Sequence, residues 1–370
     1  MSEFENSCSR QVNLADYDFD LPASLIAQYP TAPRSASRLM VIGSHGCRFH
    51  ECRFRELTDH VAEGDLLVFN DTRVIPARLA GRKRTENAGR SRSQGSGGGR
   101  IEILIEEVPD AHRALVRTRS SKPLRPGAWV DFGPNFAARC VARDEAVWEL
   151  EFNRPVADVL DAVGLVPLPP YIRRPPEASD RERYQTIFSR VDGAIAAPTA
   201  ALHFDRALVR ALSARGVRTA FVTLHVGPGT FQPVRARDAR GHRMHEERAQ
   251  VPRETVDAIL QTRARRRRVV AVGTTTVRAL ESAALPGGIA PFSGRTGLFI
   301  LPGHRFRAID ALITNFHLPR STLLLMVSAF AGRERVMAAY REAISRSFRF
   351  YSYGDAMFFT GPPGSRHDPA

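Results

Sequence analysis

The chain has 370 residues, of which 43% are hydrophobic and 25% charged, a composition ordinary for a globular protein of two domains with a large core. Its formal net charge of +14 favours an anionic partner such as nucleic acid, although lysine occurs only at Lys83 and Lys122, and such an excess of arginine also arises from GC-rich coding. No run reaches the roughly 18–20 apolar residues that span a bilayer, and residues 1–13 contain no apolar signal sequence, so we expect a cytoplasmic protein that binds no membrane.

The first half of the chain predicts one domain inserted into another. Asp65–Phe69 has the pattern of a buried strand. From residue 74 to 152, short strand-like runs separated by turn residues predict a small β-barrel or sandwich. Within this part, residues 82–99 are basic and rich in glycine and serine, which predicts a flexible loop. We therefore expect an inserted β-barrel domain at 74–152 and a discontinuous second domain formed by residues 1–73 and 153–370.

Helical and strand patterns alternate after residue 153. Asp205 is placed to cap a helix that Gly216 ends. Thr219–Val226 and Val269–Val272 have strand patterns, and Gly273 opens a further helix. This alternation is typical of an α/β fold with an open, mostly parallel sheet and helices on both faces.

Further along, a polar cluster lies between two apolar runs, Ala311–Ile313 and Leu323–Phe330. The pattern predicts a buried strand, a loop, and a buried helix that Ser321 or Thr322 caps. Loops that bring hydroxyl, amide, imidazole and guanidinium groups to the mouth of an α/β sheet usually face a ligand. The alternative is a capped helix whose polar loop has no function.

Other polar segments follow strands that we expect to end at the same edge of the sheet. Gly273–Arg278 offers backbone amides, three threonine hydroxyls and a guanidinium, which suit a ribose or a carboxylate or form an ordinary threonine cap. Gly227 and Gly229 allow either close approach to a ligand or a simple turn. His203 either faces a ligand or is structural. The run Phe348–Met357 either stacks on unpaired bases or packs in the core.

Candidate metal ligands do not follow a metal-binding spacing. Cys8, Cys47, Cys52 and Cys140 form no C-x-x-C pair. The segment His242–Glu247 contains two histidines beside glutamates but does not fit the H-E-x-x-H pattern. We therefore expect neither a metal site nor an iron–sulfur cluster.

Eleven segments, taken in chain order, match one family. They are Tyr17–Pro22, Asn70–Arg78, Gly99–Glu102, Pro167–Ile172, Tyr184–Thr186, Ala197–Thr199, Thr223–Phe231, His242–Glu247, Val272–Arg278, Thr314–Thr322 and Tyr351–Met357. On these segments the chain resembles the S-adenosylmethionine:tRNA ribosyltransferase-isomerases (QueA family) from about Tyr17 to Phe358. It departs from the family pattern where Ala201 replaces a glycine, Pro228 interrupts the glycine turn, His304 replaces an aromatic residue and Phe348 replaces a tyrosine.

The resemblance implies a transferase-isomerase of queuosine biosynthesis, with S-adenosylmethionine as a ribosyl-donating co-substrate. The ribosyl group would move to 7-aminomethyl-7-deazaguanine at the wobble position of a tRNA anticodon and rearrange to an epoxycyclopentane, giving epoxyqueuosine with loss of adenine and methionine. The implied partner is tRNA carrying a guanosine-derived wobble base. No metal is implied, and a monomer would suffice.

The same resemblance gives the candidate site residues. The candidate catalytic groups are the imidazoles of His203, His225 and His317, which we expect to carry protons in an order that the sequence leaves open, and the carboxylate of Asp355, which would orient the amine or the ribose hydroxyls. The candidate substrate-binding residues, for ribose, adenine, phosphate or the methionine carboxylate, are Arg73, Thr199, Thr274, Thr275, Thr276, Arg278, Asn315, Arg320, Ser321 and Tyr353.

Two other functions stay open. An RNA methyltransferase would use the same co-substrate but release S-adenosylhomocysteine instead of adenine and methionine. A non-catalytic RNA-binding module would give no turnover and an affinity that falls steeply with salt concentration.

Overall fold

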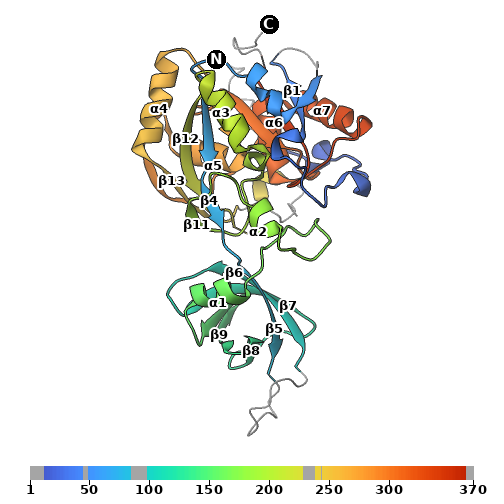
Figure 1. Ribbon diagram of the computed structural model, residues 1–370, viewed down its shortest axis with the longest axis vertical. Coiled ribbons are helices and arrows are strands. Elements are labelled where there is room, and N and C mark those ends of the chain that lie inside the picture. Colours follow the sequence, from blue (N-terminus) through green and yellow to red (C-terminus); the bar gives the residue numbers. More distant parts are fainter. Residues whose placement is uncertain (1–11, 45–48, 85–97, 228–237, 243, 364–370) are drawn as a thin grey trace. The chain divides into compact units, whose positions relative to one another are not determined.

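The computed structural model describes residues 12–44, 49–84, 98–227, 238–242 and 244–363 (Figure 1). The chain forms two compact units. The first, which we call the α/β unit, comprises Met1–Arg73, Pro169–Arg174 and Glu182–Ala370. The second, the barrel unit, comprises Val74–Leu168 and Pro175–Arg181.

A nine-stranded sheet in the order β17-β13-β12-β3-β14-β18-β19-β1-β2 forms the centre of the α/β unit. Its strands are β1 (Arg38–Ile42), β2 (Phe49–Arg53), β3 (Leu66–Asn70), β12 (Arg218–Leu224), β13 (Glu247–Val251), β14 (Val269–Val272), β17 (Phe292–Thr296), β18 (Ala311–Asn315) and β19 (Ala356–Phe359). Strands β12, β3, β14 and β18 run parallel to one another, as β1 and β19 do, whereas β2, β13, β17 and the β18–β19 pair are antiparallel. The predicted α/β class is confirmed, with a sheet that is parallel at its centre and mixed overall.

Helices cover both faces of this sheet, because most residues of its central strands are apolar and buried on both sides. In β3, Leu66 and Val68 pack into one core cluster, and Leu67 and Phe69 into the other. The first cluster includes α4 (Arg253–Ala264), α5 (Thr274–Ser282), α6 (Thr322–Ala331) and α7 (Arg333–Ser345). The second includes α3 (Arg206–Ala214) and the 3-10 helix η4 (Phe54–Asp59).

The shorter elements of the α/β unit connect these layers. They are η1 (Leu14–Tyr17), η2 (Ala23–Leu25), η3 (Arg34–Ala36), β4 (Thr72–Val74, which runs into the barrel unit), β11 (Val191–Ala194), η5 (Thr199–His203), η7 (Ala239–Gly241), β15 (Ala284–Leu285) and β16 (Gly288–Ile289). The predicted helix starts are confirmed. The Asp205 carboxylate accepts from Leu208 N at 2.9 Å to cap α3, and Ser321 Oγ accepts from Leu324 N at 3.2 Å to cap α6.

A closed six-stranded barrel forms the other unit, in the order β10-β7-β6-β5-β8-β9. Its elements are β5 (Arg78–Lys83), β6 (Arg100–Glu107), β7 (Arg113–Ser120), β8 (Trp129–Gly133), β9 (Phe136–Asp144), β10 (Val147–Phe152), α1 (Val156–Val163) and the short helix α2 (Asp180–Arg183), which begins in this unit. Alternate residues such as Ile101, Ile103 and Ile105 fill its interior. This closure confirms the predicted barrel.

The second boundary of the barrel unit lies further along the chain than the sequence predicted. Its first segment ends at Leu168 and not at residue 152, because α1 buries Val156 and Val159 and because Leu165 pairs with Arg78 of β5; Pro175–Arg181 also belongs to the unit. Within the predicted flexible loop 82–99, Arg82 and Lys83 belong to β5, and residues 85–97 lie outside the described part of the chain. In the described ranges, no helix has both the length and the apolar character that a membrane span requires.

A buried ion pair holds the beginnings of two central strands together. Asp65, directly before β3, accepts from Arg268 Nη2 at 2.6 Å, Nε at 3.0 Å and the backbone N at 3.0 Å. Both side chains are almost fully buried. Because a buried charge without its partner is strongly unfavourable, the pair fixes the register of β3 against β14.

We predict that Asp65→Asn lowers the free energy of unfolding by about 3–5 kcal/mol, because the substitution leaves the buried Arg268 guanidinium without its countercharge. Urea unfolding monitored by circular dichroism measures the change. The matched control is Glu342→Gln, which removes an exposed pair with Arg346 and should cost at most about 0.5 kcal/mol. Equal losses in the two variants would contradict the structural role of Asp65.

Candidate active site

A cavity in the α/β unit lies where the central parallel strands end, the usual ligand position in an open α/β sheet. Its empty space of about 670 Å³ includes the solvent at its open mouth. Five segments supply most of its lining: residues 196–200, the start of α5, the end of β18 with the loop after it, the start of α6 and the turn before β19; Tyr171 and Val226 complete it. The polar lining residues are Tyr171, Thr199, Thr274, Thr275, Thr314, Asn315, His317, Ser321, Tyr351 and Ser352.

Asn315, the last residue of β18, is held by two hydrogen bonds that leave its carbonyl oxygen without a partner. Its Nδ2 donates to the backbone oxygen of Tyr351 at 3.1 Å and lies 3.1 Å from His203 Nε2. Its Oδ1 is buried and has no hydrogen-bond partner among the described residues. A buried acceptor without a donor is costly, so this oxygen is suited to accept from a ligand.

His203 is a neutral imidazole that accepts a hydrogen bond from the Asn315 amide. Burial, with smaller contributions from Arg349 and Arg34, lowers its pKa to about 3. Because the Asn315 amide donates to Nε2, the ring proton belongs on Nδ1, which lies 2.7 Å from Ser37 Oγ. Phe54 stacks on the ring with a centroid separation of 4.9 Å. His203 therefore fixes the orientation of the Asn315 amide and does not itself line the cavity.

His317 does line the cavity, and it is also neutral. Burial lowers its pKa to about 3. Its Nε2 lies 2.8 Å from Thr314 Oγ1, and its backbone N–H donates to the Tyr340 hydroxyl at 2.8 Å. At neutral pH this ring is an imidazole and not an imidazolium ion, so it cannot act as a general acid, but it can hydrogen-bond to a ligand.

Thr275 joins the cavity to the end of a second central strand. Its Oγ1 accepts from Asn70 Nδ2 at 3.2 Å and can still donate its own proton. Asn70, the last residue of β3, is fully buried and bonds on its other sides to the backbone of Leu224 and Thr72. Gly273, with φ of 95°, turns the chain so that α5 begins at the cavity wall.

Of the predicted site residues, six meet at this cavity. They are Thr199, Thr274, Thr275, Asn315, His317 and Ser321. Ser321 also donates to Leu318 O at 2.7 Å while it caps α6, so its side chain has a structural role as well.

The structure places two of the predicted binding residues inside the protein, away from the cavity lining. Thr276 Oγ1 donates to the backbone oxygen of Val272, the last residue of β14, at 2.7 Å. The Arg278 guanidinium is buried in an ion pair with Glu247 and donates to Leu298 O at 3.1 Å. Neither side chain is available for a phosphate or a carboxylate, because its polar atoms already bond within the protein.

Asp355 and His225 also lie outside the lining of the cavity. The Asp355 carboxylate accepts from the backbone N–H groups of Arg38 at 2.9 Å and Arg349 at 2.8 Å, and burial raises its pKa despite these bonds. The half-buried His225 has Nδ1 2.8 Å from Thr72 Oγ1, and burial lowers its pKa. Asp355 therefore closes the turn before β19 and does not face the lining.

The remaining predicted binding residues lie elsewhere in the α/β unit. Arg73 is paired with Asp192 at 3.6 Å, and Arg320 with Asp18. Tyr353 lines a smaller, separate cavity that it shares with His203 and Arg34, among other residues.

Phe348 and Phe350 of the segment before β19 pack in the core, whereas Tyr351 of the same segment lines the cavity. Phe348 and Phe350 are fully buried, and the Arg38 guanidinium lies 3.7 Å from the centroid of the Phe348 ring. These rings therefore do not present faces to unpaired bases. Ala201 is likewise fully buried.

Two other sequence features fall partly or wholly outside the described residues. Pro228 and Gly229 of the glycine turn belong to the range 228–237, which is not described. In the segment His242–Glu247, the Glu247 carboxylate forms an ion pair with Arg278 and accepts a hydrogen bond from Gly227 N at 2.8 Å.

Sequence reasoning missed the residues that orient the lining. The Tyr171 hydroxyl and Ser352 Oγ lie 2.6 Å apart at the cavity. Asn70 and Tyr171 stand in segments that match the family, so their positions carried a signal. Ser37 carried none, because its contact with His203 joins residues 166 positions apart.

Comparison with known proteins covers nearly the whole chain. A family model described as queuosine biosynthesis protein matches residues 14–359. A crystal structure from Thermotoga maritima, described as S-adenosylmethionine tRNA ribosyltransferase, is 38% identical in sequence. The match covers 93% of this chain and 99% of that chain, with a TM-score of 0.52.

We predict that stability falls as the pH is lowered from about 6.5 toward 3, partly through His203 and His317. Their pKa values are about 3 in the folded chain and near 6.5 when unfolded, so below pH 6.5 the unfolded state binds the extra protons. Each histidine then lowers the free energy of unfolding by up to about 1.4 kcal/mol for each pH unit below 6.5.

Urea unfolding of the wild type and of His203→Gln at pH values between 4.5 and 8 measures this contribution. The variant should show a shallower loss of stability on the acid side, whereas His245→Gln at an exposed position should follow the wild type. An unchanged acid slope in His203→Gln would show that this imidazole is not held neutral.

Proposed function

Because the chain belongs to the queuosine biosynthesis protein family, we propose that it is an S-adenosylmethionine:tRNA ribosyltransferase-isomerase. In this reaction the ribosyl group of S-adenosylmethionine moves to 7-aminomethyl-7-deazaguanine at the tRNA wobble position and rearranges to the epoxycyclopentane of epoxyqueuosine. Adenine and methionine are released. The similar Thermotoga maritima protein, whose name states this co-substrate and tRNA, supports the assignment.

The unpartnered Oδ1 of Asn315 is the observation that carries the proposal. An adenosyl group presents an exocyclic amine and two ribose hydroxyls, and this oxygen can accept a hydrogen bond from any of them. Thr275, which also lines the cavity, offers a hydroxyl that Asn70 already orients. The cavity thus provides fixed, uncharged hydrogen-bonding groups of the kind that position a nucleoside.

The lining of the cavity is uncharged and partly aromatic. The described lining residues include no aspartate, glutamate, lysine or arginine. A sulfonium in such a cavity keeps its positive charge, which acidifies the adjacent C–H bond and favours proton removal. The rings of Tyr171 and Tyr351, with centroids 4.6 Å apart, offer π-faces to a cation or to adenine.

The histidines fit binding roles better than the proton-carrying roles that the sequence suggested. A general base works best with a pKa near the operating pH, and the pKa of about 3 at His203 and His317 lies far below it. We propose that His317 hydrogen-bonds to the adenosyl group and that His203 orients Asn315. Asp355 has no proposed contact with substrate, because its carboxylate accepts backbone N–H groups in the turn before β19.

A product assay distinguishes this function from the alternatives. Purified protein is incubated with S-adenosylmethionine and tRNA carrying 7-aminomethyl-7-deazaguanine, and the products are separated by liquid chromatography with mass detection. We expect adenine, methionine and a tRNA heavier by a ribosyl-derived group. S-adenosylhomocysteine would instead identify a methyltransferase, and salt-dependent tRNA binding without any product would identify an RNA-binding module.

We further predict that Thr275→Val lowers kcat/KM by about 10- to 100-fold, the loss of one hydrogen bond to the substrate. Thr276→Val is the matched control, because the Thr276 hydroxyl bonds to Val272 O at the end of β14 and does not line the cavity. Steady-state release of adenine measures both. Wild-type activity in Thr275→Val would remove this residue from the proposed binding site.

A further inference from the structure

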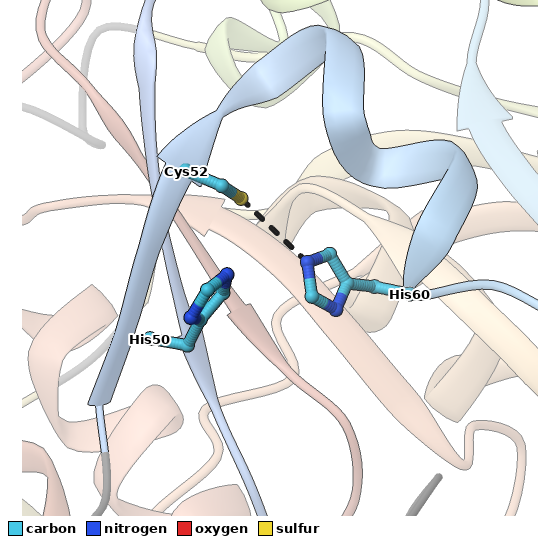
Figure 2. A group of neighbouring side chains, drawn as sticks. All are labelled: His50, Cys52 and His60. Carbon is cyan, nitrogen blue, oxygen red and sulfur yellow. Dashed lines mark hydrogen bonds between the residues drawn. The ribbon is translucent and has the colours of Figure 1, made fainter.

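Three side chains that bind transition metals meet on one side of the α/β unit, outside the lining of the cavity. They are His50, Cys52 and His60 (Figure 2). The one ligand atom that each offers lies within 4.8 Å of the other two. This cluster is the strongest grouping of histidine, cysteine and carboxylate side chains in the described part of the chain.

The local fold brings these residues together. His50 and Cys52 are two positions apart in β2, the outermost strand of the sheet, so their side chains point to the same side. After β2 the helix η4 turns the chain back, anchored by the fully buried Phe54 and Leu57. His60 follows directly at the end of η4, and Figure 2 shows its ring directed toward Cys52.

The backbone of His60 is fixed on both sides. Its N–H donates to Leu57 O at 3.0 Å, and its carbonyl accepts from Arg268 Nη2 at 3.0 Å. Arg268 is itself held by Asp65. The donor on this side of the cluster is therefore attached to a rigid part of the fold.

The distances suit a tetrahedral ion. Zinc binds thiolate sulfur at about 2.3 Å and imidazole nitrogen at about 2.0–2.1 Å, which places these two ligands about 3.6 Å apart around a tetrahedral centre. Cys52 Sγ and His60 Nε2 are 3.6 Å apart. The rings of His50 and His60 have centroids 5.5 Å apart, and His50 is exposed, so its ring can rotate to complete the set.

Charged groups of both signs surround the cluster, because Glu51 is paired with Arg38 and Asp59 with Arg215. The carboxylates of Glu51, Glu56 and Asp59 lie near enough to act electrostatically on Cys52. The positive charge of the neighbouring Arg268 is neutralised by Asp65.

We propose that His50, Cys52 and His60 bind one zinc ion, with a fourth position left for water. The ion would join the edge strand β2 to η4 and so stabilise this side of the sheet. The proposal is independent of the proposed enzymatic function, because none of the three residues lines the cavity. It departs from the prediction of no metal, which rested on the spacing of cysteines in the sequence.

Cobalt is a suitable probe, since Co²⁺ takes zinc sites and a cobalt–thiolate bond gives a charge-transfer absorption band in the near ultraviolet. The full chain, without a polyhistidine tag and stripped of metal by a chelator, is titrated with Co²⁺. We expect the band to saturate at one equivalent and to disappear when Zn²⁺ is added. No band at micromolar protein and metal concentrations would overturn the proposal.

Variants locate the site. Cys52→Ser should abolish the band, and the matched control Cys140→Ser, which changes a buried cysteine of the barrel unit, should keep it. His50→Ala alters an exposed side chain, so the fold should survive while Zn²⁺ affinity measured by calorimetry falls at least about tenfold. Persistence of the band in Cys52→Ser, or unchanged affinity in His50→Ala, would place any bound metal elsewhere and refute the site.

Discussion

A buried asparagine at the end of a central strand is the constraint on which the candidate active site depends. A buried amide must find hydrogen-bond partners, and the two asparagines that end β3 and β18 find them differently. Asn70 bonds on all sides to protein groups and thereby fixes Thr275. Asn315 uses both of its N–H groups on His203 and Tyr351 and keeps one acceptor without a partner. The first asparagine orients Thr275, which lines the cavity, and the second keeps an acceptor oxygen that a ligand can use.

The same burial that orders these side chains removes their charge. His203 and His317 lie where water cannot stabilise an imidazolium ion, so both are neutral at physiological pH. In the proposed function, hydrogen-bonding groups and aromatic rings of the lining would hold the ligand.

The arginine excess that suggested nucleic-acid binding serves the fold in part. Arg268 and Arg278 are buried in ion pairs, and Arg335 is buried with bonds to the carbonyl oxygens of Ala331, Gly43 and Gly361. Arginine suits such positions because its planar fork satisfies several acceptors at once. A net charge of +14 is therefore not a direct measure of the surface that is available to RNA.

The sequence by itself determined the α/β class, the barrel, and helix starts such as those at Asp205 and Ser321. These features depend on periodicity and on caps three residues away, which local sequence contains. Only the tertiary structure decided which polar residues share a cavity and which are structural. Thr275 and Thr276 are neighbours in sequence, but a helix turns them by about 100° relative to each other, so one faces the cavity and the other its own backbone. Asp355, Ser37 and the His50–Cys52–His60 cluster likewise take their roles from the packing of separate elements, which residue type and spacing do not encode.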